Sequence, residues 1–132
     1  MLTIIAGIFL VLHGMVHLLY AGQSGRLFEL HPGMTWPVGS WLFSRMLGDE
    51  AIRLLASVSL VLIALGFISG GAGLFFRQEW WRPMAIGAAA LSSVLFILCW
   101  DGKFQALDAK GGVGLLINLA ILFIILILKW RP

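Results

Sequence analysis

The chain has 132 residues, of which 61% are hydrophobic and only 11% charged, and its mean hydropathy is +1.01. Soluble domains are about half apolar and about a quarter charged, so this composition excludes a soluble globular domain and indicates an integral membrane protein. The formal net charge of +3 comes from basic residues scattered over the connections and the chain end, which excludes a nucleic-acid-binding face, and the single Cys99 excludes an internal disulfide.

Four apolar segments follow one another along the chain, each close to the ~20 residues that the hydrocarbon core of a bilayer requires. They cover approximately residues 2–20, 51–76, 83–100 and 113–129. The first has no basic residues before it and is too long for a signal peptide, so we expect a mature helix. Lipid offers backbone amides no hydrogen-bond partner, so these spans must be helical. We therefore expect one all-α domain over residues 1–132, a polytopic membrane protein built as an up-and-down bundle of four transmembrane helices.

Acidic residues are divided unevenly between the two sides of this predicted bundle. An even number of spans puts both chain ends on one side, called here the terminal side, and the first and third connections on the other, the loop side. Basic residues number four and five on the two sides, so the positive-inside rule sets no orientation. The terminal side has a single acid, Glu79, and the loop side has Glu29, Asp49, Glu50, Asp101 and Asp108. We expect a multi-pass protein of the inner (plasma) membrane with cytoplasmic termini.

The first connection, residues 21–50, is too apolar for a solvated linker and is interrupted by prolines and glycines. After Ser40, the stretch WLFSRML has the pattern of a short amphipathic helix. We expect this helix to lie in the membrane interface and to roof the loop-side end of the bundle.

His13 and His17 lie four positions apart inside the first apolar segment. At about 100° per residue, small and polar residues fall on one stripe of this helix and large aliphatic residues on the other. The first stripe contains Thr3, Ala6, Gly7, Leu10, His13, Gly14, His17, Tyr20 and Ala21, and the second contains Ile4, Ile8, Val11, Leu12, Met15 and Leu19. Helices in lipid associate through small residues, so we expect both imidazoles to face the other helices.

Each of the other three spans brings a polar group to the loop-side half. These groups are Glu50 and Arg53 at the start of the second span, Asp101 at the end of the third and Asn118 near the start of the fourth. Together with His13 and His17 we expect them to line a polar pocket that binds a ligand. Structural interpretations stay open as well. In these structural interpretations, Glu50 caps its helix and pairs with Arg53, and Asn118 joins helices by hydrogen bonding. The two imidazoles are then neutral, hydrogen-bonded groups of the core.

The terminal-side half carries small residues in place of polar ones. Gly66 and Gly70 form a GxxxG pair in the second span, and Ala85, Ala89 and Ser93 recur every four residues in the third. A tight connection joins these spans, so we expect them to pack closely at this end.

Three kinds of chemistry suit the predicted pocket. An apolar cleft with a few polar groups fits the head of an amphiphile such as a quinone or lipid, with proton transfer by histidine as an added possibility. The spacing of His13 and His17 also suits a zinc site with Glu50 as a third ligand. Asp101 and His31 are further candidate ligands. Nucleophilic chemistry needs a hydroxyl near the imidazoles, and the in-span candidates, which stand in no recognisable motif, are Ser57, Ser59, Ser92 and Ser93.

In length and number of spans the whole chain resembles the small four-helix bacterial membrane proteins of the DoxX-like kind. The resemblance is one of architecture and carries over no site residue. Some of those proteins are linked to quinone-coupled oxidoreductases or to membrane complexes. The preferred interpretation is an amphiphile-binding membrane protein, and the alternative is a non-catalytic subunit that assembles with itself or with a larger complex. The sequence names no cofactor and leaves open whether the chain is an enzyme.

Overall fold

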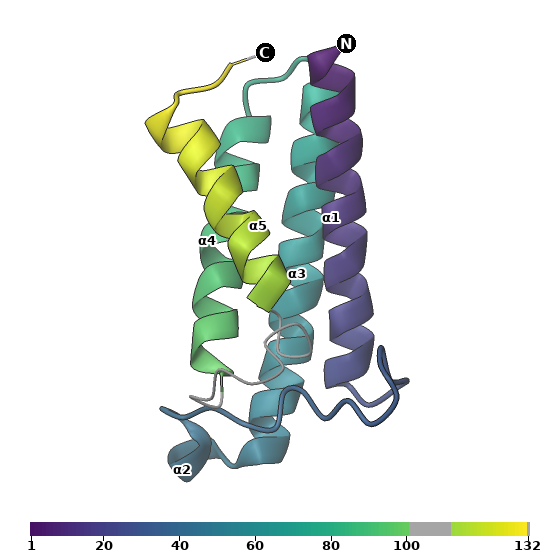
Figure 1. Cartoon of the computed structure of the whole chain (residues 1–132), viewed down its shortest axis with the longest axis vertical. Coiled ribbons are helices and arrows are strands. Elements are labelled where there is room, and N and C mark those ends of the chain that lie inside the picture. The colour runs from purple at the N-terminus through teal and green to yellow at the C-terminus, as the bar shows by residue number, and fades with distance from the viewer. Residues whose placement is uncertain (101–111, 132) are drawn as a thin grey trace.

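The computed structural model describes residues 1–100 and 112–131, and every regular element within these ranges is helical. Figure 1 shows α1 (Leu2–Ser24), α2 (Ser44–Leu47), α3 (Asp49–Phe75), α4 (Trp81–Leu98), α5 (Gly112–Leu122) and the π-helical turn η2 (Phe123–Ile127) that continues α5. The predicted all-helical class is therefore confirmed.

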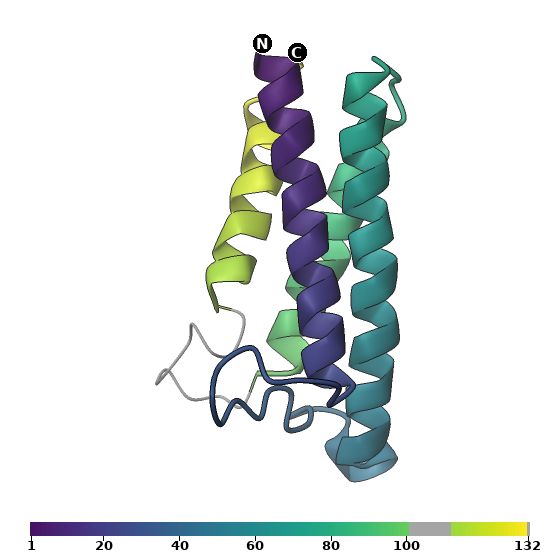
Figure 2. The same ribbon diagram turned by 90° about the vertical axis from the view of Figure 1, so that its right-hand side faces the viewer.

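Three of these helices, α1, α3 and α4, are long and apolar enough to cross a membrane, as expected for a membrane protein. The combined helix Gly112–Ile127 is apolar but shorter. α1 packs along α3, α3 along α4, and α4 along α5, so each helix lies beside the one that precedes or follows it among the four. The two views in Figures 1 and 2 place both chain ends at the same end of the molecule.

α1 buries the face that its sequence pattern predicts. Its buried residues are Gly7, Leu10, His13, Gly14, His17, Ala21, Gly22, Gln23 and Ser24. The opposite stripe stays on the surface, with Ile4, Ile8, Leu12, Met15 and Leu19 each about half exposed, except for Val11, which is partly buried against Gly71 of α3. Lipid tails are as apolar as these side chains, so leaving them outside costs nothing in a bilayer, whereas the small residues allow the backbones of α1 and α3 to approach.

Glycines set the close approach of α3 to both of its neighbours. A Cβ atom on Gly71 would lie 2.7 Å from the carbonyl oxygen of Gly7 in α1. On the other side of α3, a Cβ on Gly66 would lie 3.0 Å from the Cβ of Ala88, and one on Gly70 would lie 3.3 Å from the carbonyl oxygen of Trp81. The predicted close packing of the GxxxG pair against the third span is confirmed.

The first connection folds across the loop-side ends of the helices. Met34 and Trp36 are buried there in an apolar cluster with residues such as Ala21 and Phe96. Gln23, which is fully buried, donates to the carbonyls of Met34 and Trp36 and accepts from the Leu30 amide. Of the predicted WLFSRML helix, only Ser44–Leu47 is helical.

Replacing Gly71 with alanine is expected to destabilise the protein by about 1–3 kcal/mol, because the added methyl group meets backbone atoms of α1 that cannot rotate away. Gly87 in α4 is the matched control, since no atom lies within 4 Å of its Cβ position. Gly87→Ala is expected to leave stability unchanged or to raise it by up to about 1 kcal/mol. The free energy of unfolding in mixed micelles measures both effects, and equal destabilisation by the two variants would contradict the packing described here.

Candidate functional site

Four buried side chains form a closed series of hydrogen bonds that joins α1, α5 and α4. His13 Nε2 lies 2.8 Å from Asn118 Oδ1, and Asn118 Nδ2 lies 2.7 Å from Ser92 Oγ. Ser92 Oγ lies 2.7 Å from His17 Nε2, and His17 Nδ1 lies 2.8 Å from the backbone oxygen of His13. We call His13, Asn118, Ser92 and His17 the polar circuit; their exposed fractions are 6%, 0%, 0% and 2%.

The polar circuit permits one assignment of protons when His17 is neutral. A backbone carbonyl only accepts, so His17 carries its proton on Nδ1, and its Nε2 must accept from the Ser92 hydroxyl. The same hydroxyl then accepts from the Asn118 amide, which turns the amide oxygen toward His13. His13 therefore donates from Nε2. Each bond has one donor and one acceptor, and two neutral imidazoles satisfy all of them.

α3 contributes an aromatic wall to this site in place of a polar group. The fully buried Phe67 meets the edge of the His13 ring at a centroid distance of 4.7 Å and the His17 ring at 5.1 Å. Phe9 stacks on His13 and Phe96 lies against His17, with centroid distances of 5.8 and 6.1 Å. The rings exclude other polar groups from the imidazoles, so the circuit is enclosed by apolar side chains.

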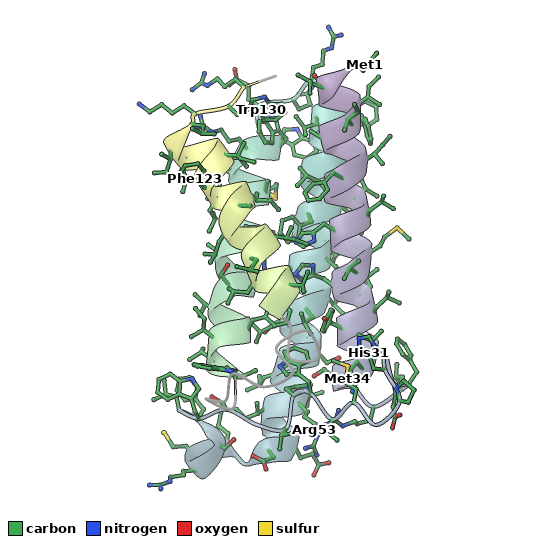
Figure 3. All side chains as sticks on the ribbon, viewed as in Figure 1. Met1, His31, Met34, Arg53, Phe123 and Trp130 are labelled. Atoms are coloured by element: carbon green, nitrogen blue, oxygen red, sulfur yellow. The ribbon has the colours of Figure 1, made fainter. Side chains whose placement is uncertain are left out.

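The charged residues predicted for the same pocket lie elsewhere. Arg53 lies level with Ser24, whose hydroxyl binds the Arg53 carbonyl, and Ser24 is about 10 Å along α1 from His17 and about 16 Å from His13. Figure 3 shows Arg53 at the loop-side end, where His31 and Met34 also lie. Glu50 is exposed in the first turn of the same helix. Asp101 lies outside the described residues.

The structure thus brings together His13, His17 and Asn118 but separates them from Glu50 and Arg53. Buried apolar side chains, among them Ala56 and Leu60, occupy α3 between the two groups. Ser92, one of the four in-span hydroxyls that the sequence offers, completes the circuit. Its neighbour Ser93, another of the four, instead donates to the Ala89 carbonyl of its own helix at 2.8 Å. Only the rotation of α4 about its axis distinguishes the two serines.

Glu50 and Arg53 line a separate cavity of about 690 Å³ between the loop-side ends of α1 and α3. Its walls are Ser24, Gly25, Arg26, Leu47, Glu50, Ala51, Arg53 and Leu54. Ser24 fixes the two helix ends to each other, since its hydroxyl donates to the Arg53 carbonyl at 2.7 Å. Within the described residues, the side chains of Glu50 and Arg53 form no hydrogen bond or salt bridge. Among the described residues, the cavity therefore holds one cation and one carboxylate without a side-chain partner.

Arg26 belongs to the wall of this cavity and also holds the first connection in place. Its guanidinium donates to the carbonyls of Thr35, Trp36 and Pro37 at 2.6, 3.1 and 3.0 Å. Partial burial lowers the pKa of Arg26, the neighbouring charge of Arg53 lowers it further, and Glu29 raises it. An arginine remains protonated under such perturbation, so Arg26 and Arg53 together keep this end of the cavity positive.

Within residues 1–100 and 112–131, no three His, Cys, Asp or Glu side chains are grouped so that they could hold a metal ion. The set considered for zinc is not brought together, because His13 and His17 lie within α1 and Glu50 is exposed in the first turn of α3, at the loop-side end. His31 is exposed on the first connection.

Comparison of the chain with protein-family models finds no match, and comparisons with curated proteins and with solved structures find none either. The resemblance to DoxX-like proteins stays a prediction of the sequence.

Adjacent serines provide a test of the polar circuit. Ser92→Ala leaves the Asn118 amide and the His17 Nε2 without their shared partner, and we expect it to lower the free energy of unfolding by about 1–2 kcal/mol. Ser93→Ala removes only a bond within α4, and we expect a change below about 0.5 kcal/mol. Unfolding in mixed micelles compares the two variants. Similar values for both would show that the circuit does not stabilise the helix packing.

Proposed function

We propose that this chain is a multi-pass protein of the inner membrane that binds the polar head of an amphiphile, such as a quinone or a lipid, in its loop-side cavity. In this proposal α1, α3, α4 and the combined helix α5–η2 all cross the bilayer as a four-helix bundle, the termini are cytoplasmic, and α2 lies in the opposite interface. The observation that carries the proposal is the cavity of about 690 Å³ in which Glu50 and Arg53 have no partner among the described residues.

The fourth span is the shortest of the proposed set. The 11 residues of α5 and the 5 of η2 extend at most about 24 Å, less than the ~30 Å of an average hydrocarbon core. A bilayer adapts to a short span by thinning locally at modest cost. Asn118 supports the assignment, because its hydrogen bonds to α1 and α4 hold α5 beside helices that are themselves long enough to span.

Terminal fusions test the number of spans. Four spans place both chain ends on the cytoplasmic side, so green fluorescent protein fused to either end is expected to fluoresce, and alkaline phosphatase at the same positions is expected to be inactive. Three spans would give opposite results at the two ends. Active alkaline phosphatase at both ends would place both termini in the periplasm, which agrees with four spans but reverses the proposed orientation.

The loop-side cavity has the polarity that an amphiphile requires. Arg53 can donate to a carbonyl or phosphate oxygen, and Glu50 can accept from a hydroxyl or ammonium group of the same head. Leu47 and Leu54 line the same cavity and are 49% and 66% exposed, so an attached apolar tail can leave the cavity along the outer surface of α3. The ligand would reach this position from the bilayer.

The polar circuit is assigned a structural role in this proposal. Its hydrogen bonds are used among His13, Asn118, Ser92 and His17 themselves, and apolar rings enclose the imidazoles. A ligand role for these residues, or proton transfer by the histidines, would require the circuit to open.

Arg53→Gln is expected to weaken amphiphile binding about tenfold or more, because it removes a charge-assisted hydrogen bond at the head group. Arg45→Gln is the control, since Arg45 is exposed on α2 at the same end and does not line the cavity. Native mass spectrometry of the detergent-solubilised protein measures binding of two probes, decylubiquinone and phosphatidylethanolamine. If neither probe binds the unmodified chain, or if both variants bind equally, the proposal fails and the assembly-subunit alternative is favoured.

A further inference from the structure

A second cavity, of about 580 Å³, lies at the opposite end of the molecule from the proposed amphiphile site. Its walls are Thr3, Leu74, Arg77, Gln78, Glu79, Trp81, Arg82, Pro83 and Arg131. Figure 3 shows this terminal-side end, where Met1 and Trp130 lie. Three guanidinium groups face one carboxylate here, so the lining carries an excess of positive charge.

The three arginines come from three separate parts of the chain. Arg77 lies two residues beyond the end of α3, Arg82 lies in the first turn of α4, and Arg131 lies beyond η2. The end of the chain, from η2 to Arg131, is held against α4 by two contacts. Arg82 Nη2 donates to the Ile125 carbonyl at 3.0 Å, and the rings of Trp81 and Trp130 meet edge to face at 5.9 Å. The convergence of the arginines is therefore a product of tertiary packing.

The positive charge in this cavity is not neutralised by the residues that the structure describes. Arg82 Nε is buried and has no hydrogen-bond partner among them. Arg77 and Arg131 form no salt bridge within the same ranges. A buried donor without a partner is costly, and like charges in one cavity repel each other, so an anion with several acceptor oxygens would relieve both penalties.

Arg77 has a backbone conformation that costs more for arginine than for glycine. Its φ is 54°, in the left-handed region. The end of α3 is closed there by two hydrogen bonds, from the Arg77 amide to the Leu74 carbonyl and from the Gln78 amide to the Gly73 carbonyl. Glycine is the usual residue at this position of a helix end. Arg26 has the same conformation after α1, and there the guanidinium binds the carbonyls of the first connection. At the end of α3 the guanidinium instead lines the cavity.

The geometry points to a binding site for the phosphate group of an anionic lipid in the terminal-side cavity, with Arg77, Arg82 and Arg131 as the ligand-holding residues. Planar guanidinium groups bind phosphate oxygens in bidentate fashion, and basic pockets between membrane helices suit lipid head groups. The cavity lies where α4, an apolar helix long enough to cross a membrane, begins at Trp81, and tryptophan favours head-group depth. This site shares no residue with the loop-side cavity and does not depend on it.

The test is native mass spectrometry of the full chain in detergent, titrated with phosphatidylglycerol. Arg82→Gln and Arg131→Gln are each expected to weaken binding about tenfold, because each removes charge-assisted bonds to phosphate. Arg82 also bonds to the Ile125 carbonyl, whereas Arg131 is exposed, so Arg131→Gln separates ligand binding from folding. Lys129→Gln is the control, since Lys129 lies at the same end, carries the same charge and does not line the cavity. Its binding is expected to stay within about twofold of the unmodified chain.

Two further arms decide the nature of the ligand. Phosphatidylcholine is expected to bind at least tenfold more weakly than phosphatidylglycerol, because its choline cation would meet the arginines. Inorganic phosphate at millimolar concentration is expected not to displace phosphatidylglycerol. Equal weakening by Lys129→Gln, equal binding of the two lipids, or full displacement by free phosphate would each overturn the assignment: the first two would indicate non-specific attraction, and the third a soluble anion.

Discussion

The hydrogen bonds of the polar circuit are the constraint on which the arrangement of the helices depends. Imidazole, amide and hydroxyl groups in a hydrocarbon interior have no water to bond, so each needs a protein partner. The circuit provides these partners only when α1, α4 and α5 take one rotation and one depth relative to each other. Apolar packing between helices in lipid constrains their rotation and depth less, because lipid tails are as apolar as the side chains and can replace them at the contact.

Sequence periodicity predicted which faces of the helices pack against their neighbours. The buried face of α1 and the close packing at Gly66 and Gly70 follow from residue size at helical spacing, and the structure confirms them. The depth of groups on different helices was predicted less well. α1 continues to Ser24, beyond the expected end near Tyr20, so His17 lies about 10 Å from its loop-side end. The charges of the second span therefore lie at the ends of the helices and not at the depth of the imidazoles.

Interhelical pairing required information that one helix cannot supply. The sequence singled out both histidines and Asn118, since polar residues within a span need partners, and the structure joins them. It could not choose between Ser92 and Ser93, which differ by about 100° around α4. The roles of Arg26 and Gln23 were also beyond the sequence, because their partners are carbonyls and an amide of the first connection, whose path no periodic pattern defines.

The distribution of polar groups separates the structural interior from two chemically different ends. The circuit uses its hydrogen bonds internally, and the charges of the described residues lie at the two ends of the helices. In the loop-side cavity Arg26 is bound to backbone carbonyls, and the other two charged lining residues, Glu50 and Arg53, have opposite charges. At the terminal-side end the cavity has an excess of arginine. Head groups are recognised by charge and hydrogen-bonding pattern, so the two sites proposed here would favour different classes of amphiphile. In that proposal the helix core, held by neutral hydrogen bonds, keeps both cavities in place without taking part in binding.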